Sequence, residues 1–306
     1  MNKIIVKILC GILLIMLATS CEKEGKLSKK CKIDTVTSHT SVYRDGQLMY
    51  RYGDQQMQQW FWDDDELYRI DYTEDEATYS EIVFTDKKGR ISGTRIDAYR
   101  IVSRFVYDGR WLDSVIVSIG GTEAYSYAFT HEDRHIVRID LNVASPAVDE
   151  KLLAMNPLRL LPTFGINVGC LASVSAKGFD TSCDAVYTLE WDHDNVSLLT
   201  LTQNGVTTEY RYTYDENRNP YRQCFSYYAF SSGELGLDFL SENNIVTVMT
   251  TFDGNPNYTF RYTYTYNDDK LPATSYMSYI YHDINNTSLE QSEYRVEETR
   301  TYNYCE

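Results

Sequence analysis

His131, Glu132 and His135 match H-E-x-x-H, the pattern of zinc hydrolases. In that pattern a helix places both imidazoles on one face to bind zinc, and the glutamate acts as general base. Here the pentapeptide lies between two segments that alternate apolar and polar residues, which predicts strands rather than a helix. We therefore expect a solvated hairpin turn at this place, with a zinc hydrolase as the alternative.

Acidic residues recur in a second set of segments that could bind ions. Clustered carboxylates suit Ca²⁺, which takes six to eight oxygen ligands, but Asp and Asn also favour turns through bonds to the backbone. No D-x-D-x-D-G loop occurs, so we predict turns, no metal and no cofactor. The segments are Asp63–Glu66, Asp192 with Asp194, Asp215–Glu216 and Asp268–Asp269.

Aromatic residues form a third set. Between Tyr258 and Tyr266 every second residue is aromatic, a period of two that places the rings on one face of a strand. Such a face is either core or, where exposed, a surface that stacks on sugars or holds a peptide. The candidate ligand-binding residues are Trp60, Trp62, Tyr258, Tyr262, Tyr264 and Tyr266.

Signatures of nucleophilic or nucleotide chemistry are missing from the sequence. There is no G-x-S-x-G, no P-loop and no G-x-G-x-x-G. A carboxylate pair for glycoside cleavage is defined by its separation in space, and 44 acidic residues leave many pairs open. We therefore expect a protein that is not an enzyme, with a glycoside hydrolase as an alternative.

An aromatic residue followed by an acidic turn is the repeating unit that must position these residues. Successive anchors are mostly 22 or 23 residues apart, which fits two strands and two turns. Sequential hairpins of this length predict an all-β antiparallel meander of about 14–16 strands. The anchors are Trp62, Phe84, Tyr107, Phe129, Trp191, Tyr214 and Tyr266.

Two longer gaps between anchors predict insertions at 142–185 and 226–256, which interrupt repeats at 34–141 and 186–306 of one domain. In the first gap Ser145 is an N-cap for a helix that ends at Asn156. An open sheet of more than about ten strands curls or splits. We expect a strongly curved sheet, or two packed halves, with the helix and loop of 142–185 packed on one face.

The first residues carry a targeting signal. Two lysines, a short apolar run and small residues precede Cys21, which is the order of a secretory signal at 1–20. The run resembles a bacterial lipoprotein signal cleaved before a lipidated Cys21; an ordinary secretory site is the alternative. Residues 21–33 then form a tether, and a membrane partner is expected through the lipid. The acids and lysine at 22–24 resemble tags that send Bacteroidota lipoproteins to the cell surface.

Composition excludes one class of partner. The chain of 306 residues has 43% hydrophobic residues, 27 tyrosines and a net charge of −15. Nucleic acid is not expected to bind, because its phosphates need a basic surface. An oxidising envelope permits disulfides, and Cys170 and Cys183 are the candidate pair among the remaining cysteines.

The aromatic and acidic turn unit resembles the tyrosine–aspartate (YD) repeats of bacterial secreted shell proteins, as at Tyr107-Asp108-Gly109. A closer resemblance is to a family of Bacteroidota lipoproteins with a Tyr-rich meander. It rests on Met155–Pro157, the turn from Tyr214-Asp215 to Asn219-Pro220, and Asn243-Asn244. The resemblance implies an outer-membrane lipoprotein and brings no catalytic residues. We expect a non-catalytic binding or scaffolding module for glycan or an envelope protein; a purely structural protein is a further alternative.

Overall fold

A computed structural model describes residues 32–305 apart from 45, 65, 75–76, 144–184, 204, 225–239 and 282–293. Almost all of the described chain is β-strand. Within these residues no helix has the length and apolar character needed to cross a bilayer. Cys21, Cys170, Cys183 and the expected helix at Ser145 lie outside the described residues.

Sixteen strands follow one another in an antiparallel order. The first half comprises β1 (Ile33–Arg44), β2 (Gln47–Asp63), β3 (Glu66–Glu74), β4 (Ala77–Thr85), β5 (Ile91–Ile96), β6 (Ile101–Asp108), β7 (Trp111–Ile119) and β8 (Thr122–Glu132). The second half comprises β9 (His135–Val143), β10 (Ala185–Asp192), β11 (Asn195–Gln203), β12 (Val206–Arg218), β13 (Asn243–Phe252), β14 (Asn255–Tyr266), β15 (Pro272–Tyr281) and β16 (Tyr294–Tyr304). Among the described residues the other elements are two short helices, η1 (Asp97–Tyr99) and α4 (Pro220–Cys224).

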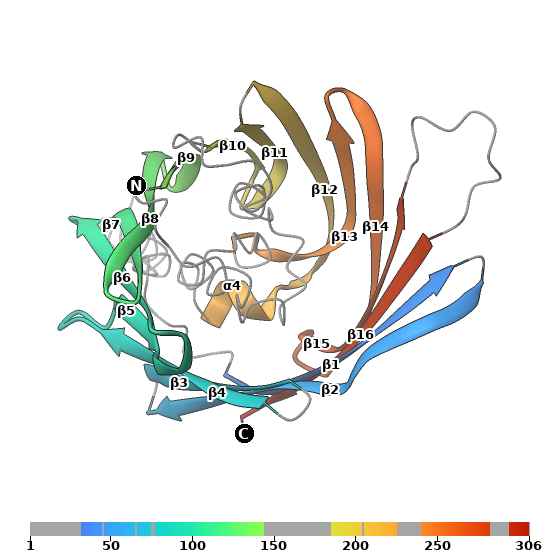
Figure 1. Ribbon diagram of the computed structural model, residues 1–306, viewed down its shortest axis with the longest axis horizontal. Helices are drawn as coiled ribbons and strands as arrows, with labels where there is room; N and C mark the ends of the chain where they lie inside the picture. Colours follow the sequence, from blue (N-terminus) through green and yellow to red (C-terminus); the bar gives the residue numbers. More distant parts are fainter. Residues whose placement is uncertain are drawn as a thin grey trace, which may run out of the picture.

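The sheet closes on itself, as Figure 1 shows. β1 pairs with β16 in an unbroken antiparallel register from Thr35–Asn303 to Arg44–Tyr294. The prediction of an all-β antiparallel meander is confirmed, but the expectation of an open curved sheet is wrong. Closure leaves no unpaired edge strand, and the right-handed twist of successive hairpins accumulates until the first and last strands meet.

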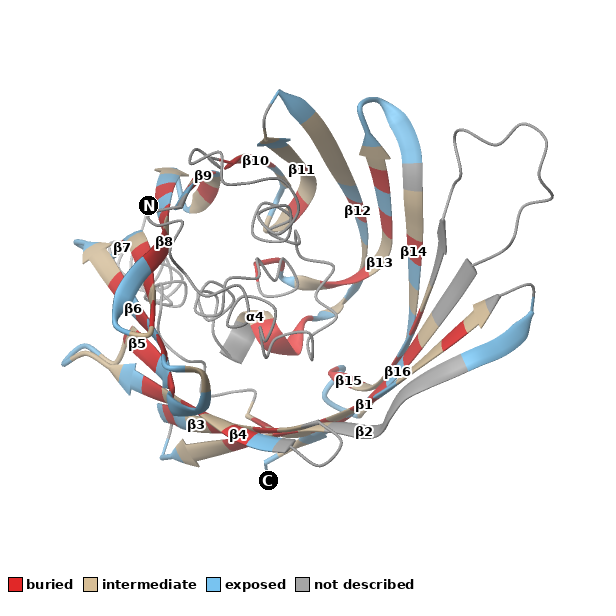
Figure 2. Cartoon of the chain, in the orientation of Figure 1, coloured by how far each residue is buried: buried red, intermediate tan, exposed pale blue. Residues whose placement is uncertain are grey.

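Side chains alternate between the inside and the outside of the barrel. On β6 the inward residues Ile101, Ser103 and Phe105 are buried, whereas Val102 and Arg104 between them are exposed. The same period of two runs along most strands in Figure 2. The apolar core therefore fills the lumen side of the barrel.

One end of the barrel, here called the acidic end, carries the turns that join each even-numbered strand to the next strand. Its turns include Asp63–Glu66, Asp192–Asn195 and the turn after Tyr266. Lys32, which precedes β1, also lies at this end, where its ammonium donates to the backbone oxygen of Asp64 at 2.6 Å. The predicted acidic turns at Asp63–Glu66, Asp192 with Asp194 and Asp268–Asp269 lie at this end, whereas Asp215–Glu216 lie within β12, so the prediction of a turn there is wrong.

At the acidic end, each odd-numbered strand stops pairing with the even-numbered strand that follows it before either strand ends. Such two strands are here called an odd–even pair. β5 and β6 pair from Ile96–Ile101 only as far as Gly93–Arg104, so the carbonyl of Ile91 has no backbone partner across the gap. The Tyr107 hydroxyl donates to that carbonyl at 2.8 Å. A β-bulge between Val106 and Tyr107 turns the ring inward for this contact.

The same contact recurs around the barrel. In seven of the eight odd–even strand pairs, a side chain near the end of the even strand donates to a carbonyl at the start of the odd strand, at 2.6–2.8 Å. The donor and acceptor pairs are Trp62–Ile33, Tyr107–Ile91, His131–Leu112, Trp191–Ile136, Tyr214–Val196, Tyr264–Ile245 and Tyr304–Pro272. These donors, here called rim donors, replace ladder hydrogen bonds and explain why Tyr and Trp recur at the repeat anchors.

Three of the predicted anchors are not rim donors: on β14 the donor is Tyr264 rather than Tyr266, and two further anchors, on β4 and β8, are misplaced along the repeat. The bulge that marks the rim position falls between Phe84 and Thr85 on β4, and between Thr130 and His131 on β8. Phe84 points outward and is 41% exposed. The rim positions are therefore Thr85 and His131, not Phe84 and Phe129, because two units place a small or a basic residue where the others place Tyr or Trp.

Thr85 gives a test of the rim contact. Replacement by tyrosine is expected to supply the missing donor to the carbonyl of Leu67, the buried second residue of β3. A neutral hydrogen bond contributes about 1 kcal/mol, so Thr85→Tyr should raise the free energy of unfolding by about that amount over Thr85→Phe in urea titrations. Equal stability of the two variants would show that the hydroxyl finds no acceptor here.

The second predicted insertion is shorter than expected. β13 already begins at Asn243, so the hairpin of β13 and β14 occupies the end of the range 226–256. α4 precedes it inside the barrel in Figure 1. Asn219 caps this helix, since its side-chain oxygen accepts from the backbone N–H of Tyr221 at 3.0 Å, and Pro220 takes the first helical position.

Candidate functional site

A cavity of about 30 Å³ lies inside the barrel between α4 and the wall of β13–β16. Its lining combines aromatic rings, side-chain amides and a pair of opposite charges. The lining residues are Asn219, Pro220, Tyr221, Asn244, Ile245, Tyr262, Tyr264, Pro272, Ser275, Met277, Glu298, Arg300 and Tyr302. Because this concave feature brings charged, amide and aromatic side chains together, we take it as the candidate site.

Glu298 and Arg300 are its chemical centre. Both lie on the inward side of β16, and the Arg300 Nε is 2.7 Å from the Glu298 Oε1. Their side chains are 2% and 9% exposed. Burial raises the pKa of the Glu298 carboxyl, and the Arg300 charge partly offsets that rise. Burial opposes the charge of Arg300, but the Glu298 carboxylate holds the pKa of the guanidinium above its usual value.

Aromatic rings surround this ion pair. The ring of Tyr221 on α4 lies 6.3 Å from that of Trp60 and 6.1 Å from that of Tyr302, measured between centroids. Tyr262 and Tyr264 stack side by side with centroids 6.4 Å apart. The helix is thus packed between β2 and β16 by aromatic contacts, and the cavity lies beside it.

The structure brings only some of the predicted aromatic residues to this site. Tyr262 and Tyr264 line the cavity, and Trp60 touches its margin through Tyr221. Trp60 is 3% exposed and belongs to the core, so its ring is covered rather than open to a ligand. Trp62 is half-buried, and its indole N–H serves as a rim donor to Ile33.

The remaining two tyrosines of the predicted row lie elsewhere. Tyr258 is half-buried, and its ring stacks on Phe260 at 5.8 Å. The Tyr266 hydroxyl donates to the carboxylate of Asp215. Burial together with that carboxylate raises the pKa of Tyr266 to about 12. Asp215 on β12 also accepts from the backbone N–H and the side-chain amide of Asn244, which connects the end of β12 to the cavity lining.

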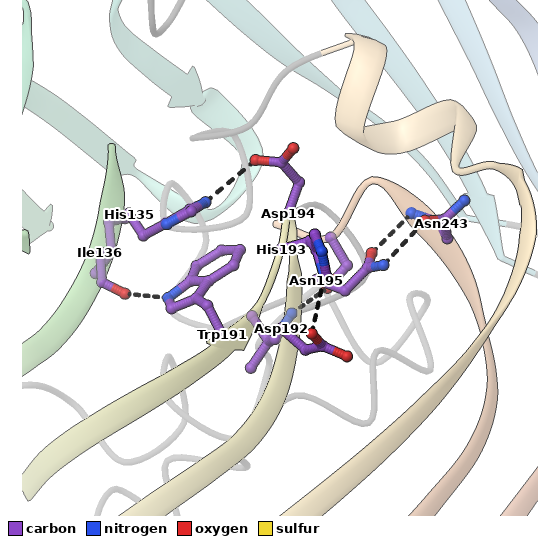
Figure 3. A network of polar contacts seen from close by, with 10 residues as sticks. His135, Ile136, Trp191, Asp192, His193, Asp194, Asn195 and Asn243 are labelled. Atoms are coloured by element: carbon purple, nitrogen blue, oxygen red, sulfur yellow. Dashed lines mark hydrogen bonds and ion pairs between the residues drawn. The ribbon is translucent and has the colours of Figure 1, made fainter. Parts of the chain in front are cut away.

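The zinc-like pattern lies across the β8–β9 hairpin, whose turn is Asp133-Arg134. The two imidazoles face different neighbours. His131 Nε2 donates to the Leu112 carbonyl on the β7 side at 2.8 Å. His135 stacks on Trp191 at 4.4 Å, and its Nε2 lies 3.2 Å from the Asp194 carboxylate (Figure 3). The strand geometry therefore places these groups as turn contacts rather than as a shared ligand set.

Figure 3 shows the contacts that continue from this pair. The Trp191 indole N–H donates to the Ile136 carbonyl at 2.8 Å. Asn195 exchanges two hydrogen bonds with Asn243, at 2.9 and 3.0 Å. The β10–β11 turn thereby fastens both the β8–β9 hairpin and the start of β13. Among the described residues no group of three or more His, Cys, Asp or Glu is arranged to hold a metal ion.

His131 makes a pH dependence testable. Burial lowers its pKa and outweighs the bond to the Leu112 carbonyl. The unfolded chain then binds a proton more readily than the folded one, so stability is present above a pH of about 6.5 and falls as the pH drops below it. His131→Gln, which keeps a donor, should lose less stability than the parent between pH 7.5 and pH 5 in urea titrations. A His193→Gln control at an exposed turn should follow the parent, and identical profiles for all three chains would contradict this assignment.

The size of the cavity limits its chemistry. A volume of 30 Å³ accommodates one or two water molecules, whereas small-molecule pockets span about 300–1,000 Å³. Glu298 is the one carboxylate among its lining residues, so the lining itself holds no pair for glycoside hydrolysis. The arrangement suits ordered water and a fixed α4 better than it suits a reaction.

Sequence reasoning missed Glu298 and Arg300. The segment Glu297–Tyr304 alternates outward Glu297, Thr299 and Thr301 with inward residues, and inward Tyr302 is buried. That period of two was the available signal. It assigns Glu298 and Arg300 to the same face as Tyr302, although charged residues are expected to face solvent.

No protein-family model and no curated protein matches the chain. Among solved structures, a porin-like protein from Bacteroides uniformis ATCC 8492 is similar over 92% of this chain and 100% of its own length, with a TM-score of 0.53 at 10% identity. At this identity the likeness shows the fold, and it agrees with the closed β-barrel described above.

Two further structures match with TM-scores too low to support an argument. A porin-like protein from Bacteroides vulgatus ATCC 8482 has a TM-score of 0.25 at 12% identity, over 90% of this chain and 99% of its own. The TcdB2-TccC3-Cdc42 complex has a TM-score of 0.27 at 8% identity, over 78% of this chain and 14% of the matched chain.

Proposed function

We propose that this protein is an outer-membrane lipoprotein, anchored through Cys21 at the cell surface, and that its barrel is a non-catalytic binding or scaffolding module. Glycan or an envelope protein is the proposed partner. The observation that carries the proposal is the direction of the side chains: most of the buried, inward residues are apolar, and most of the outward residues are polar.

The outward polarity separates this barrel from one embedded in lipid. Strands that cross a bilayer present an outward apolar band about 25 Å tall with a polar interior. On β14 the outward residues are instead Arg261, Thr263 and Thr265, while Phe260 and Tyr262 face inward. Attachment through a lipidated Cys21 supplies the membrane contact that such strands do not.

The lumen side also argues for a solid body rather than a channel. Tyr127, Tyr187 and Leu199 on the inner wall are at most 1% exposed. A water-filled pore would leave its lining polar and accessible. We infer that ligands or partners meet the turns and outer walls, not a passage through the barrel.

The anchor is tested by Cys21→Ala in cells, with membrane and soluble fractions separated after alkaline carbonate washing. The variant is expected to leave the membrane fraction, whereas a Cys31→Ala control stays with it. A Cys21→Ala protein that resists carbonate extraction would mean that the strands themselves are embedded. The binding role is tested separately by a glycan array and an envelope pull-down, and it fails if both give no partner.

A further inference from the structure

We propose that the barrel opens sideways between β9 and β10, and that side-chain contacts of Trp191 and His135 hold these two strands together. The boundary along which two neighbouring strands pair is here called a seam. Opening of the β9–β10 seam is a property of the barrel itself. It is independent of the lipid anchor and of the binding role proposed above.

The backbone ladder of the β9–β10 seam is short. The two strands pair over four residues each, from Arg138–Thr188 to Leu141–Ala185. The seam between β1 and β16, where the two ends of the sheet meet, pairs over ten residues without a break. Fewer paired residues mean fewer hydrogen bonds to break. The barrel is therefore held more weakly in the middle of the chain than where its first and last strands meet.

Two other seams have ladders of four pairs, but a tight turn joins the strands of each. Between β4 and β5 the backbone N–H of Asp86 donates to the Arg90 carbonyl at 2.7 Å. Between β5 and β6 the N–H of Arg100 donates to the Asp97 carbonyl at 3.1 Å. Residues 144–184 instead separate β9 from β10 in the chain. Because closing a loop costs more entropy as the loop lengthens, a turn favours re-pairing more than a long connection does.

Side chains replace the ladder at the acidic end of this seam. The Trp191 indole N–H donates to the Ile136 carbonyl at 2.8 Å, and the His135 and Trp191 rings stack with centroids 4.4 Å apart. The His135 Nε2 also lies 3.2 Å from the Asp194 carboxylate. These contacts, here called the clasp, join the β8–β9 hairpin to the β10–β11 turn across the seam (Figure 3).

Burial on the lumen side opposes the opening. Ile139 and Tyr187 pair across the seam, face the lumen and are 0% and 1% exposed. Separation of the strands exposes both side chains, so the open form is a minor population of the kind that hydrogen exchange detects. It also exposes two rows of backbone groups, and such strand edges pair readily with other chains. The clasp therefore protects the barrel from association through this seam.

Hydrogen exchange followed by mass spectrometry on the full chain measures the opening seam by seam. Amides that bond across β9–β10 are expected to exchange faster than those across β5–β6, a seam with an equally short ladder. Trp191→Phe removes the indole donor and should speed exchange at β9–β10 alone by about fivefold, the effect of one neutral hydrogen bond. The matched control is Trp62→Phe, which removes the rim donor to Ile33 and should leave exchange at β9–β10 unchanged.

A cross-link gives a second measurement in a Cys305→Ser background. Asp140→Cys with Val186→Cys, a pair in register across the seam, is joined by a short thiol cross-linker. It should slow exchange at β9–β10 by about thirtyfold, the lower end of the effect of a disulfide that closes a long loop. Arg95→Cys with Val102→Cys across β5–β6 should slow exchange there by less, because a tight turn already joins those strands.

Equal exchange at β9–β10 and β5–β6 in the parent chain overturns the proposal. An increase with Trp191→Phe that is the same in every strand also overturns it, because the clasp then contributes only to global stability. A β9–β10 cross-link that forms but leaves exchange unchanged shows that the amides exchange without separation of these strands, which excludes the opening as well.

Discussion

Glu298→Ala is expected to lower the free energy of unfolding by about 3–5 kcal/mol, because it leaves the Arg300 guanidinium charged and unpaired inside the barrel. The desolvation of a buried charge is tolerated only while its partner is present. Urea unfolding followed by tryptophan fluorescence gives the change directly, since Trp60 lies near the site through its contact with Tyr221.

The matched control is a similar pair on the outer face. Arg138 and Asp140 are also two residues apart on one strand, 2.6 Å from each other, but 47% and 33% exposed. Arg138→Ala is therefore expected to leave stability nearly unchanged, because solvent screens an exposed pair. A loss as large as that of Glu298→Ala would mean that burial is not the cause.

A double replacement separates charge from volume. Glu298→Leu with Arg300→Met removes both charges and keeps apolar bulk, so it should recover most of the stability lost by Glu298→Ala. If the double variant is as unstable as the single one, the pair holds α4 through hydrogen bonds that apolar groups cannot replace. Either result defines what the polar centre of the lumen contributes.

The strands could be predicted from the sequence because alternation and repeat length are local properties. The period of two in Tyr258–Tyr266 and the spacing of Trp62, Tyr107, Trp191 and Tyr214 both correspond to elements of the barrel. Closure depends on how twist and register accumulate over all strands, which no short segment encodes. The meander was therefore predictable, whereas the contact of β1 with β16 was not.

The rim positions could not all be predicted from residue types alone. Thr85 and His131 occupy the position held by Tyr or Trp in the other units, and a search for aromatic residues shifts to Phe84 and Phe129. The bulge that defines the position is a backbone feature, which many residue types tolerate. The match to H-E-x-x-H at His131 arises where this rim position and the following turn meet.

The candidate site was only partly predictable for a similar reason. Tyr262 and Tyr264 were identified by their alternation, and they line the cavity. Trp60 was identified with them but is covered by α4 through Tyr221, a contact between segments far apart in sequence. Glu298 and Arg300 carry the signal of inward positions, but a charge on an inward face needs its partner in space before it can be interpreted.

Tyr214→Phe is expected to lower the free energy of unfolding by about 1–3 kcal/mol, the largest effect among the rim donors. The Tyr214 hydroxyl donates to the Val196 carbonyl at 2.6 Å and also lies 2.8 Å from the Ser241 hydroxyl. Ser241 in turn accepts from the Val196 N–H at 3.2 Å. Removal of the Tyr214 hydroxyl thus leaves the Val196 carbonyl and the buried Ser241 hydroxyl without this partner. Both groups lie where the chain returns to β13.

Two variants set the scale for this result. Tyr107→Phe removes a rim donor with one acceptor, so its loss should be smaller than that of Tyr214→Phe. Tyr68→Phe, at an exposed ring on the outer wall, should unfold at the parent's urea concentration. If Tyr214→Phe and Tyr68→Phe have the same free energy of unfolding, the unpaired strand ends at the acidic end form their hydrogen bonds with water. The repeated aromatic residues would then act through packing alone, because the closed barrel would hold its acidic end without the donors.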